Sequence, residues 1–175
     1  MKEINKLNNF IKIFLICFIS TIFVEFFFKY VSFNQLFAKE SILIVLFSAA
    51  TCLFIAFILN FLKSNVIKIV ILIYIFFIAT YTLLQLNFKN FMDNYMSFNA
   101  ASEGGINRVL TEVKDFILAI KPVYLVVYIP FIIFLILFVL RKIKFNKQNK
   151  RNIDIVIMGT ILLIVHISSL ICLKV

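Results

Sequence analysis

The sequence predicts an all-α polytopic membrane protein: five transmembrane helices, with an outer interfacial amphipathic helix between the third and the fourth. Hydrophobic residues make up 63% of the 175 positions, whereas soluble domains hold roughly 45 to 50%. A helix crosses a hydrocarbon core of about 30 Å with roughly 20 apolar residues, and five runs of that length occur. Most charged residues lie between these runs. A soluble fold is therefore excluded, and residues 1–175 read as one transmembrane domain.

The first two spans are expected at residues 10–30 and 41–61. The first run is longer than the apolar core of a signal peptide, about 7 to 15 residues, and lacks a small-residue cleavage site, so it should remain as a helix. In the second, Ser48, Cys52 and Ala56 recur every fourth residue. Small side chains on one helix face allow a neighbouring helix to approach closely, so this face is interpreted as packing.

The third span is expected at residues 66–86, followed by an outer loop at 87–121. Apolar residues recur at helical spacing in the second half of this loop, opposite a polar face of mixed charge, which is typical of a helix lying in the membrane interface. The apolar positions are Ile106, Val109, Leu110, Val113, Phe116, Ile117 and Ile120. Such a helix either plugs the mouth of the bundle or forms a shelf for an outer domain or a lipid.

The last two spans are expected at residues 122–140 and 153–173. Pro122 suits the first turn of a helix, where its missing amide hydrogen would have no partner, but Pro130 lies inside the span and should kink it. The connector between these spans is strongly basic. Its cationic residues are Arg141, Lys142, Lys144, Lys147, Lys150 and Arg151.

Lys and Arg are unevenly divided between the two sides that five spans define. The N-terminal segment, the connector between spans two and three and the basic connector hold most of them. Cytoplasmic loops carry this excess, so the N-terminus is expected inside and the C-terminus outside. We expect further chain beyond Val175 on the outer side, and a stop codon directly after Val175 in the native gene would count against that.

A layer of polar side chains is expected in the outer third of the bilayer. At about 1.5 Å of rise per residue, Glu25, Tyr81, Tyr128 and His166, together with Ser48, fall at one depth, and Lys29 lies one turn above Glu25. Ionisable residues within spans face the bundle interior by default. The candidate lipid-headgroup residues are Glu25, Lys29, Tyr81, Tyr128 and His166. The alternative is structural: Glu25 would pair with Lys29, and His166 with a nearby serine.

The sequence contains no recognised catalytic or cofactor-binding motif, such as GxGxxG, HExxH or GxSxG. A single histidine and scattered acidic residues offer no metal site. Cys17, Cys52 and Cys172 each lie alone in a predicted span and are expected to be small buried hydrophobes. The net charge of +10 is explained by membrane topology rather than by nucleic acid.

Two segments carry a resemblance to a known family: FKNFMDNYMSF at residues 88–98 and EVKDFI at residues 112–117. With the five-span topology, they resemble the membrane domain of sulfatase-like phosphoglycerol and phosphoethanolamine transferases, the alkaline phosphatase superfamily enzymes that include lipoteichoic acid synthases. The resemblance implies a bacterial cytoplasmic membrane, a phospholipid donor and a C-terminal extracytoplasmic catalytic domain with a divalent metal. None of that domain's catalytic or metal positions occurs in this chain. We therefore expect no cofactor in residues 1–175 themselves.

Two other functions stay open at this point. One is a small self-contained transporter of lipid or solute, and the other is a non-enzymatic scaffold for another membrane protein. Several hundred soluble residues encoded beyond Val175, with a metal-binding Asp, His and Thr set, would favour the transferase. Lipid or ion flux through the chain alone would favour the transporter.

Overall fold

The computed structural model describes residues 4–34, 40–92 and 113–143, together with Phe145, Gly159, Thr160, Ile164 and Ile167. Every regular element within these residues is a helix, which confirms the all-helical class. Four segments are long and apolar enough to cross a membrane: Asn9–Phe33, Ser41–Leu59, Ser64–Phe91 and Pro122–Val139. The expected fifth span at 153–173 lies almost wholly outside the described residues, so the count of five stays a prediction.

The helices α1 (Ile4–Phe33) and α2 (Glu40–Leu59) form the first pair. After Phe33, Asn34 takes a positive φ of 53°, and its amide donates to the Tyr30 carbonyl at 2.9 Å. Asparagine tolerates this left-handed conformation better than most residues, which explains why α1 ends here.

The third helix, α3 (Ser64–Met92), continues past Leu86, where the third span was expected to end. The last turns of α3 bury side chains against other elements of the structure. Asn87 and Phe88 are almost fully buried, and the Phe91 ring packs edge-on against Phe116 at 5.6 Å between centroids. The first residues of the expected outer loop therefore belong to α3.

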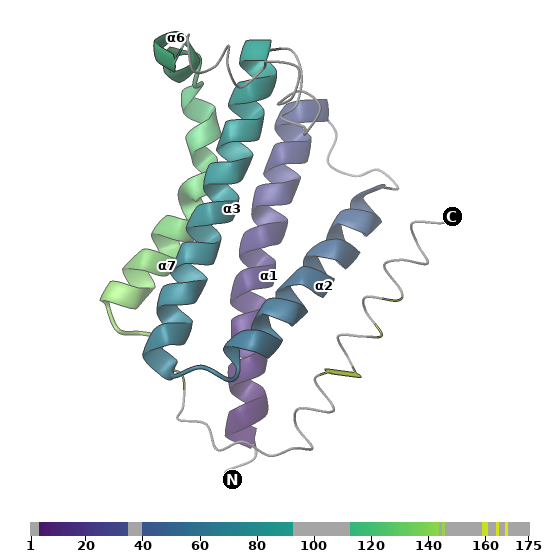
Figure 1. The fold of residues 1–175 in the computed structure, drawn as a ribbon, viewed down its shortest axis with the longest axis vertical. Coiled ribbons are helices and arrows are strands. Elements are labelled where there is room, and N and C mark those ends of the chain that lie inside the picture. The colour runs from purple at the N-terminus through teal and green to yellow at the C-terminus, as the bar shows by residue number, and fades with distance from the viewer. Residues whose placement is uncertain are drawn as a thin grey trace.

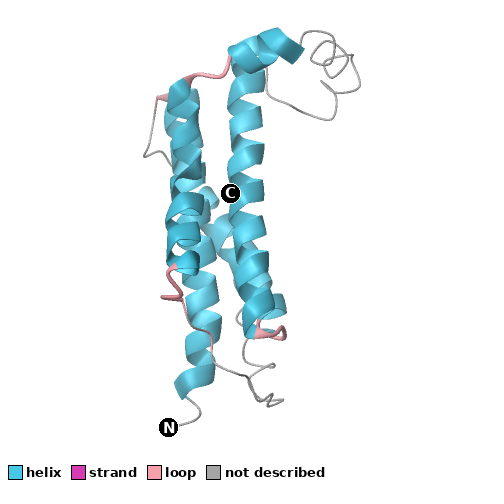
Figure 2. Cartoon of the chain, turned by 90° about the vertical axis from the view of Figure 1, so that its left-hand side faces the viewer, coloured by secondary structure: helices cyan, strands magenta, loops and turns pink. Residues whose placement is uncertain are grey.

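The helices stand in a row, in the order α7, α3, α1 and α2 across Figure 1. α1 packs against α2 and α3, and α3 packs against the segment formed by η2 and α7. α1 and α3 run in the same direction, and both finish at the end of the bundle where α6 lies (Figure 1). We call this end of the bundle the α6 end; Figure 2 shows the same end from the side, with the N-terminus at the opposite end.

Two apolar clusters hold the row together. The one away from the α6 end joins Ile13 and Cys17 of α1, Cys52 of α2, and Ile71 and Ile75 of α3, all fully buried. Nearer the α6 end, a second cluster joins the last part of α3 to η2. Its buried members are Ala79, Leu83, Leu86, Tyr124 and Val127.

The small residues of α2 occupy the packed face, as expected from their spacing. Ser48 is 6% exposed, and both Cys52 and Ala56 are 0% exposed. Their small volume lets α1 approach α2 closely. Cys17 is buried as well, whereas Cys172 lies outside the described residues.

The fourth span is made of two helix types, the 3-10 helix η2 (Pro122–Tyr128) and the α-helix α7 (Ile129–Val139). Pro130 lies in the first turn of α7, and the Ile129 amide donates to Val126 by the shorter 3-10 pattern. Because Pro130 has no amide hydrogen to donate to the preceding turn, the interruption takes the form of this change of helix type. The segment also changes direction there (Figure 1).

The short helix α6 (Val113–Leu118) lies within the expected interfacial helix. Phe116 is buried, whereas Ile117 and Val113 are exposed. Carbonyls in the last turn of a helix lack partners within the helix, and here Asn87 Nδ2 donates to Phe116 O at 2.7 Å and Asn90 Nδ2 to Ala119 O at 3.0 Å. These bonds fix α6 to α3. The residues Ile106, Val109 and Leu110 lie outside the described part, so the full amphipathic helix stays a prediction.

Candidate functional site

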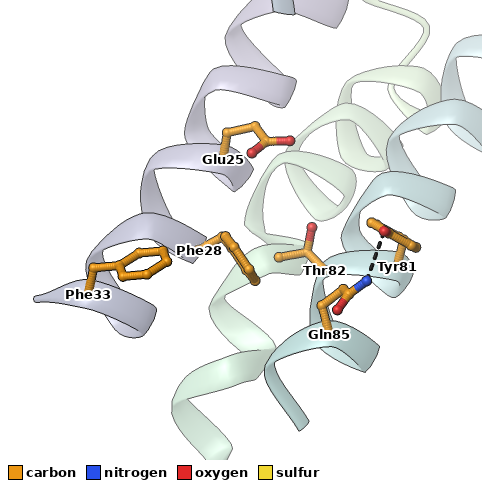
Figure 3. Close-up of a pocket in the computed structure, with 6 residues that line it drawn as sticks. All are labelled: Glu25, Phe28, Phe33, Tyr81, Thr82 and Gln85. Atoms are coloured by element: carbon orange, nitrogen blue, oxygen red, sulfur yellow. Dashed lines mark hydrogen bonds between the residues drawn. The ribbon is translucent and has the colours of Figure 1, made fainter. Parts of the chain in front are cut away.

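A cleft between α1 and α3 contains two of the predicted headgroup residues. It has a volume of about 310 Å³ and is lined by Glu25, Phe28, Phe33, Tyr81, Thr82 and Gln85. Figure 3 shows the first three projecting from α1 and the other three from α3. We call it the Glu25 cleft.

Helical spacing explains how these residues meet. Residues three or four apart lie on one face of a helix, so Glu25 and Phe28 face α3, while Tyr81 and Gln85 share a face of α3. Because α1 and α3 run in the same direction, the two sets advance together toward the α6 end. The polar residues of α3 therefore line the same cleft as Glu25 of α1.

The polar wall of α3 is ordered by a hydrogen bond. Gln85 Nε2 donates to the Tyr81 hydroxyl at 2.8 Å, as the dashed line in Figure 3 shows. Gln85 and Thr82 are each 7% exposed, but Tyr81 is 50% exposed. Tyr81 therefore stands at the rim of the cleft, and its hydroxyl is held by the buried amide.

Glu25 makes no hydrogen bond or ion pair with another described residue. A carboxylate within the membrane is costly unless it has a partner. The alternative pairing with Lys29 is not formed, because Lys29 Nζ donates instead to Ser41 Oγ at the start of α2, at 2.7 Å. Glu25 thus gives the cleft a carboxyl group that other described residues do not neutralise.

A second cavity, which we call the Thr21 cavity, shares Glu25 with the cleft. It measures about 410 Å³ and lies among α1, α2 and α3. Its polar lining residues are Thr21, Glu25, Ser48, Thr51 and Tyr74. Ser48 was expected at the depth of Glu25, and the two do line this cavity together.

Two other predicted site residues, Tyr128 and Lys29, lie elsewhere. The Tyr128 hydroxyl bonds to Thr80 Oγ1 at 2.9 Å and its ring packs against Phe76 and Phe131, so it joins η2 to α3 rather than lining the cleft. Lys29 lines neither cavity, and His166 lies outside the described residues.

Thr82 and Gln85 were not predicted as site residues. Their position was visible in the sequence, because Gln85 lies four residues after Tyr81 and therefore on the same helix face. A count of all polar residues on that face would have found both. The structure adds that they face α1 and not lipid.

The chemistry available in the Glu25 cleft is hydrogen bonding and electrostatic attraction. It offers one carboxyl group, the hydroxyls of Tyr81 and Thr82 and the amide of Gln85. Within the described residues, no group of three or more His, Cys, Asp or Glu side chains is placed to hold a metal ion. The arrangement suits binding of a polar or cationic group.

Fold and cleft together define a class: a bundle of helices long and apolar enough to cross a membrane, with a cleft between two of them that both polar and aromatic side chains line. Comparisons of the chain with protein-family models, curated proteins and solved structures found no match.

Proposed function

We propose that this chain is the membrane domain of a phospholipid-headgroup transferase, in which the Glu25 cleft receives the headgroup of a donor lipid. The domain would have five spans with the N-terminus inside. Its partner would be an extracytoplasmic catalytic domain that follows Val175. The observation that carries the proposal is the cleft itself, which a carboxyl, two hydroxyls and an amide line together with two phenylalanine rings.

The charge of the cleft favours one class of headgroup. The carboxyl of Glu25 has no cationic partner among the described residues, so an ammonium group entering the cleft would supply one. Tyr81 and Gln85 would bond to headgroup oxygens. Phosphoethanolamine carries such an ammonium group, whereas phosphoglycerol offers only hydroxyls. The proposal therefore ranks a phosphoethanolamine donor above a phosphoglycerol donor.

The position of α6 supports the part of the proposal that concerns an outer catalytic domain. Asn87 and Asn90 fix α6 to the end of α3, with Ile117 and Leu118 exposed at 57% and 72%. Exposed apolar side chains at the membrane surface provide a shelf for lipid or for an outer domain. In the predicted orientation, this shelf lies on the outer side.

The test is headgroup transfer by membranes that contain the native gene product, measured as diacylglycerol released from labelled donor lipid. Glu25→Gln keeps the shape of the side chain but removes its charge. Hydrogen bonds to charged groups contribute about 1.5 to 3 kcal/mol, so turnover should fall at least about tenfold at equal membrane abundance. Asp115→Asn is the matched control, because Asp115 is exposed on α6 and does not line the cleft.

Two results would count against the proposal. One is a native gene product that transfers no headgroup from any donor lipid. The other is a loss of activity in Glu25→Gln that follows a loss of protein from the membrane, since this would make the residue structural.

The second candidate is a small lipid-flipping protein, and one observation favours it. Glu25 lines both cavities, so polar side chains continue from Gln85 through Glu25 to Thr21. Thr21 lies about 18 Å below the end of α1 at 1.5 Å per residue. A polar track of this depth suits movement of a headgroup across the bilayer. Flux of labelled lipid in liposomes containing only this chain would support this function over the first.

A further inference from the structure

A third cavity lies at the α6 end, where three membrane-spanning segments begin or end. It measures about 230 Å³, and its lining is more polar than that of the Glu25 cleft. The lining residues are Val31 and Ser32 of α1, Leu86, Lys89 and Asn90 of α3, and Lys121 and Tyr124 at the start of η2. We call it the Lys89 pocket.

Its depth corresponds to the headgroup layer of a bilayer. Ser32 lies one residue before the end of the first candidate span, Lys89 lies in the last turn of the third, and Lys121 directly precedes the segment Pro122–Val139. The ends of apolar spans mark the boundary between hydrocarbon and headgroups. Lipid phosphate groups occupy this level.

Lys89 is held at the pocket by two contacts with α1. Its Nζ donates to Ser32 O at 2.8 Å and lies 5.3 Å from the centroid of the Phe33 ring. The carbonyls in the last turn of a helix carry partial negative charge, which favours a lysine there. The ammonium group is therefore fixed in position rather than extended into water.

Lys121 brings a second ammonium group to the same pocket. Lys121 is exposed, and the one interaction of its side chain with a described residue is with the Tyr124 ring, 6.0 Å from the centroid. Two cations that line one pocket repel each other, and an anion between them removes that repulsion. Asp115, the acidic residue described nearest to Lys121 along the chain, is exposed on α6 and does not line the pocket.

Ser32 provides an independent indication of a ligand. Its Oγ is buried and has no hydrogen-bond partner among the described residues, which is an unfavourable state for a hydroxyl group. A serine hydroxyl donates readily to an anionic oxygen. A bound oxyanion would provide the partner that the described residues do not.

From these observations we infer that the Lys89 pocket binds a phosphate group, with Lys89, Lys121 and the Ser32 hydroxyl as its partners. The inference does not depend on the transferase proposal, because it concerns a different cavity and a different chemical group. The phosphate belongs either to a lipid headgroup or to a soluble phosphate. Both sources share the same oxyanion chemistry, and the experiment distinguishes them.

The experiment measures binding to the full chain, purified in a nonionic detergent, by native mass spectrometry. The probes are dioctanoyl phosphatidylglycerol and, separately, inorganic phosphate. Lys121→Gln should weaken binding about tenfold, because a charge-assisted hydrogen bond is lost. Lys114→Gln is the matched control: Lys114 is exposed on α6 and does not line the pocket, so this variant should bind like the unmodified chain.

Ser32→Ala separates ligand binding from a structural role. Removing a hydroxyl that has no partner should not lower the unfolding temperature of the ligand-free chain, yet it should weaken binding of the probe. Lys121→Arg keeps the charge and should restore most of the binding lost in Lys121→Gln. Competition by millimolar inorganic phosphate would identify a soluble phosphate as the ligand, and lack of competition would identify the lipid.

Three results would overturn the inference. The unmodified chain binds neither probe, or Lys121→Gln binds as tightly as Lys114→Gln, or Lys121→Arg binds as weakly as Lys121→Gln.

Discussion

A partly buried hydrogen bond between α1 and α3 provides a direct measure of how polar contacts stabilise this bundle. Thr21 Oγ1 lies 2.8 Å from the Tyr74 hydroxyl and 2.9 Å from the Cys17 carbonyl, to which it donates. Both groups are satisfied only if Tyr74 donates to Thr21. Removing either side chain should therefore break the same contact between the helices.

The expected loss of unfolding free energy depends on which hydrogen-bond partners each substitution leaves for Thr21 or Tyr74. Tyr74→Phe removes the donor and leaves Thr21 bonded to its own helix, so the free energy of unfolding should fall by about 0.6 to 1.7 kcal/mol, the average and the maximum for hydrogen bonds between membrane helices. Thr21→Val leaves the Tyr74 hydroxyl with only the Cys52 sulfur at 3.8 Å. An unsatisfied hydroxyl costs about 1 to 3 kcal/mol.

The assay is reversible unfolding of the full chain in mixed micelles with increasing SDS. The double variant also removes the hydroxyl that Thr21→Val leaves unsatisfied, so it should be more stable than Thr21→Val alone, and the coupling should exceed about 1 kcal/mol. Ser20→Ala is the control, because Ser20 Oγ makes the same type of bond to Ile16 O within its own helix. Strictly additive effects of Tyr74→Phe and Thr21→Val would refute the reasoning.

Two further predictions concern the ends of helices. Arg141 has a positive φ of 53° after α7, a conformation that glycine adopts more easily than alanine. In the same unfolding assay, Arg141→Gly should therefore be about 1 kcal/mol more stable than Arg141→Ala, and both variants lack the charge. Equal stabilities would contradict this prediction. Asn87 is 0% exposed and bonds to Phe116 O at 2.7 Å. Asn87→Ala should therefore speed amide hydrogen exchange in α6 about tenfold. Asn90→Ala is the control and should have a smaller effect, because the hydrogen bond it removes is more exposed. Unchanged exchange in Asn87→Ala would show that α6 is held by other contacts.

Prediction from the sequence worked best where one physical rule dominated. Four segments that the hydropathy pattern selects are helices long and apolar enough to cross a membrane. The small residues Ser48, Cys52 and Ala56 are buried at the expected face. Both results follow from periodicity along a single helix, which requires no knowledge of its neighbours.

Prediction was less accurate where partners had to be chosen. Depth along the bilayer placed Glu25 and Tyr81 at one level, and the structure brings both to one cleft. Depth says nothing about rotation around the helix axis, however. Tyr128 instead bonds to Thr80, and Lys29 to Ser41.

The sequence by itself determined that the chain is helical, that its helices are apolar enough for a membrane and that a few polar residues lie within them. Those properties depend on composition and on local spacing. Only the tertiary structure decided which polar groups meet, because that depends on how each helix is rotated against the next. It brought Thr82 and Gln85 to face Glu25, and it joined Ser32, Lys89 and Lys121 from three separate segments into one pocket.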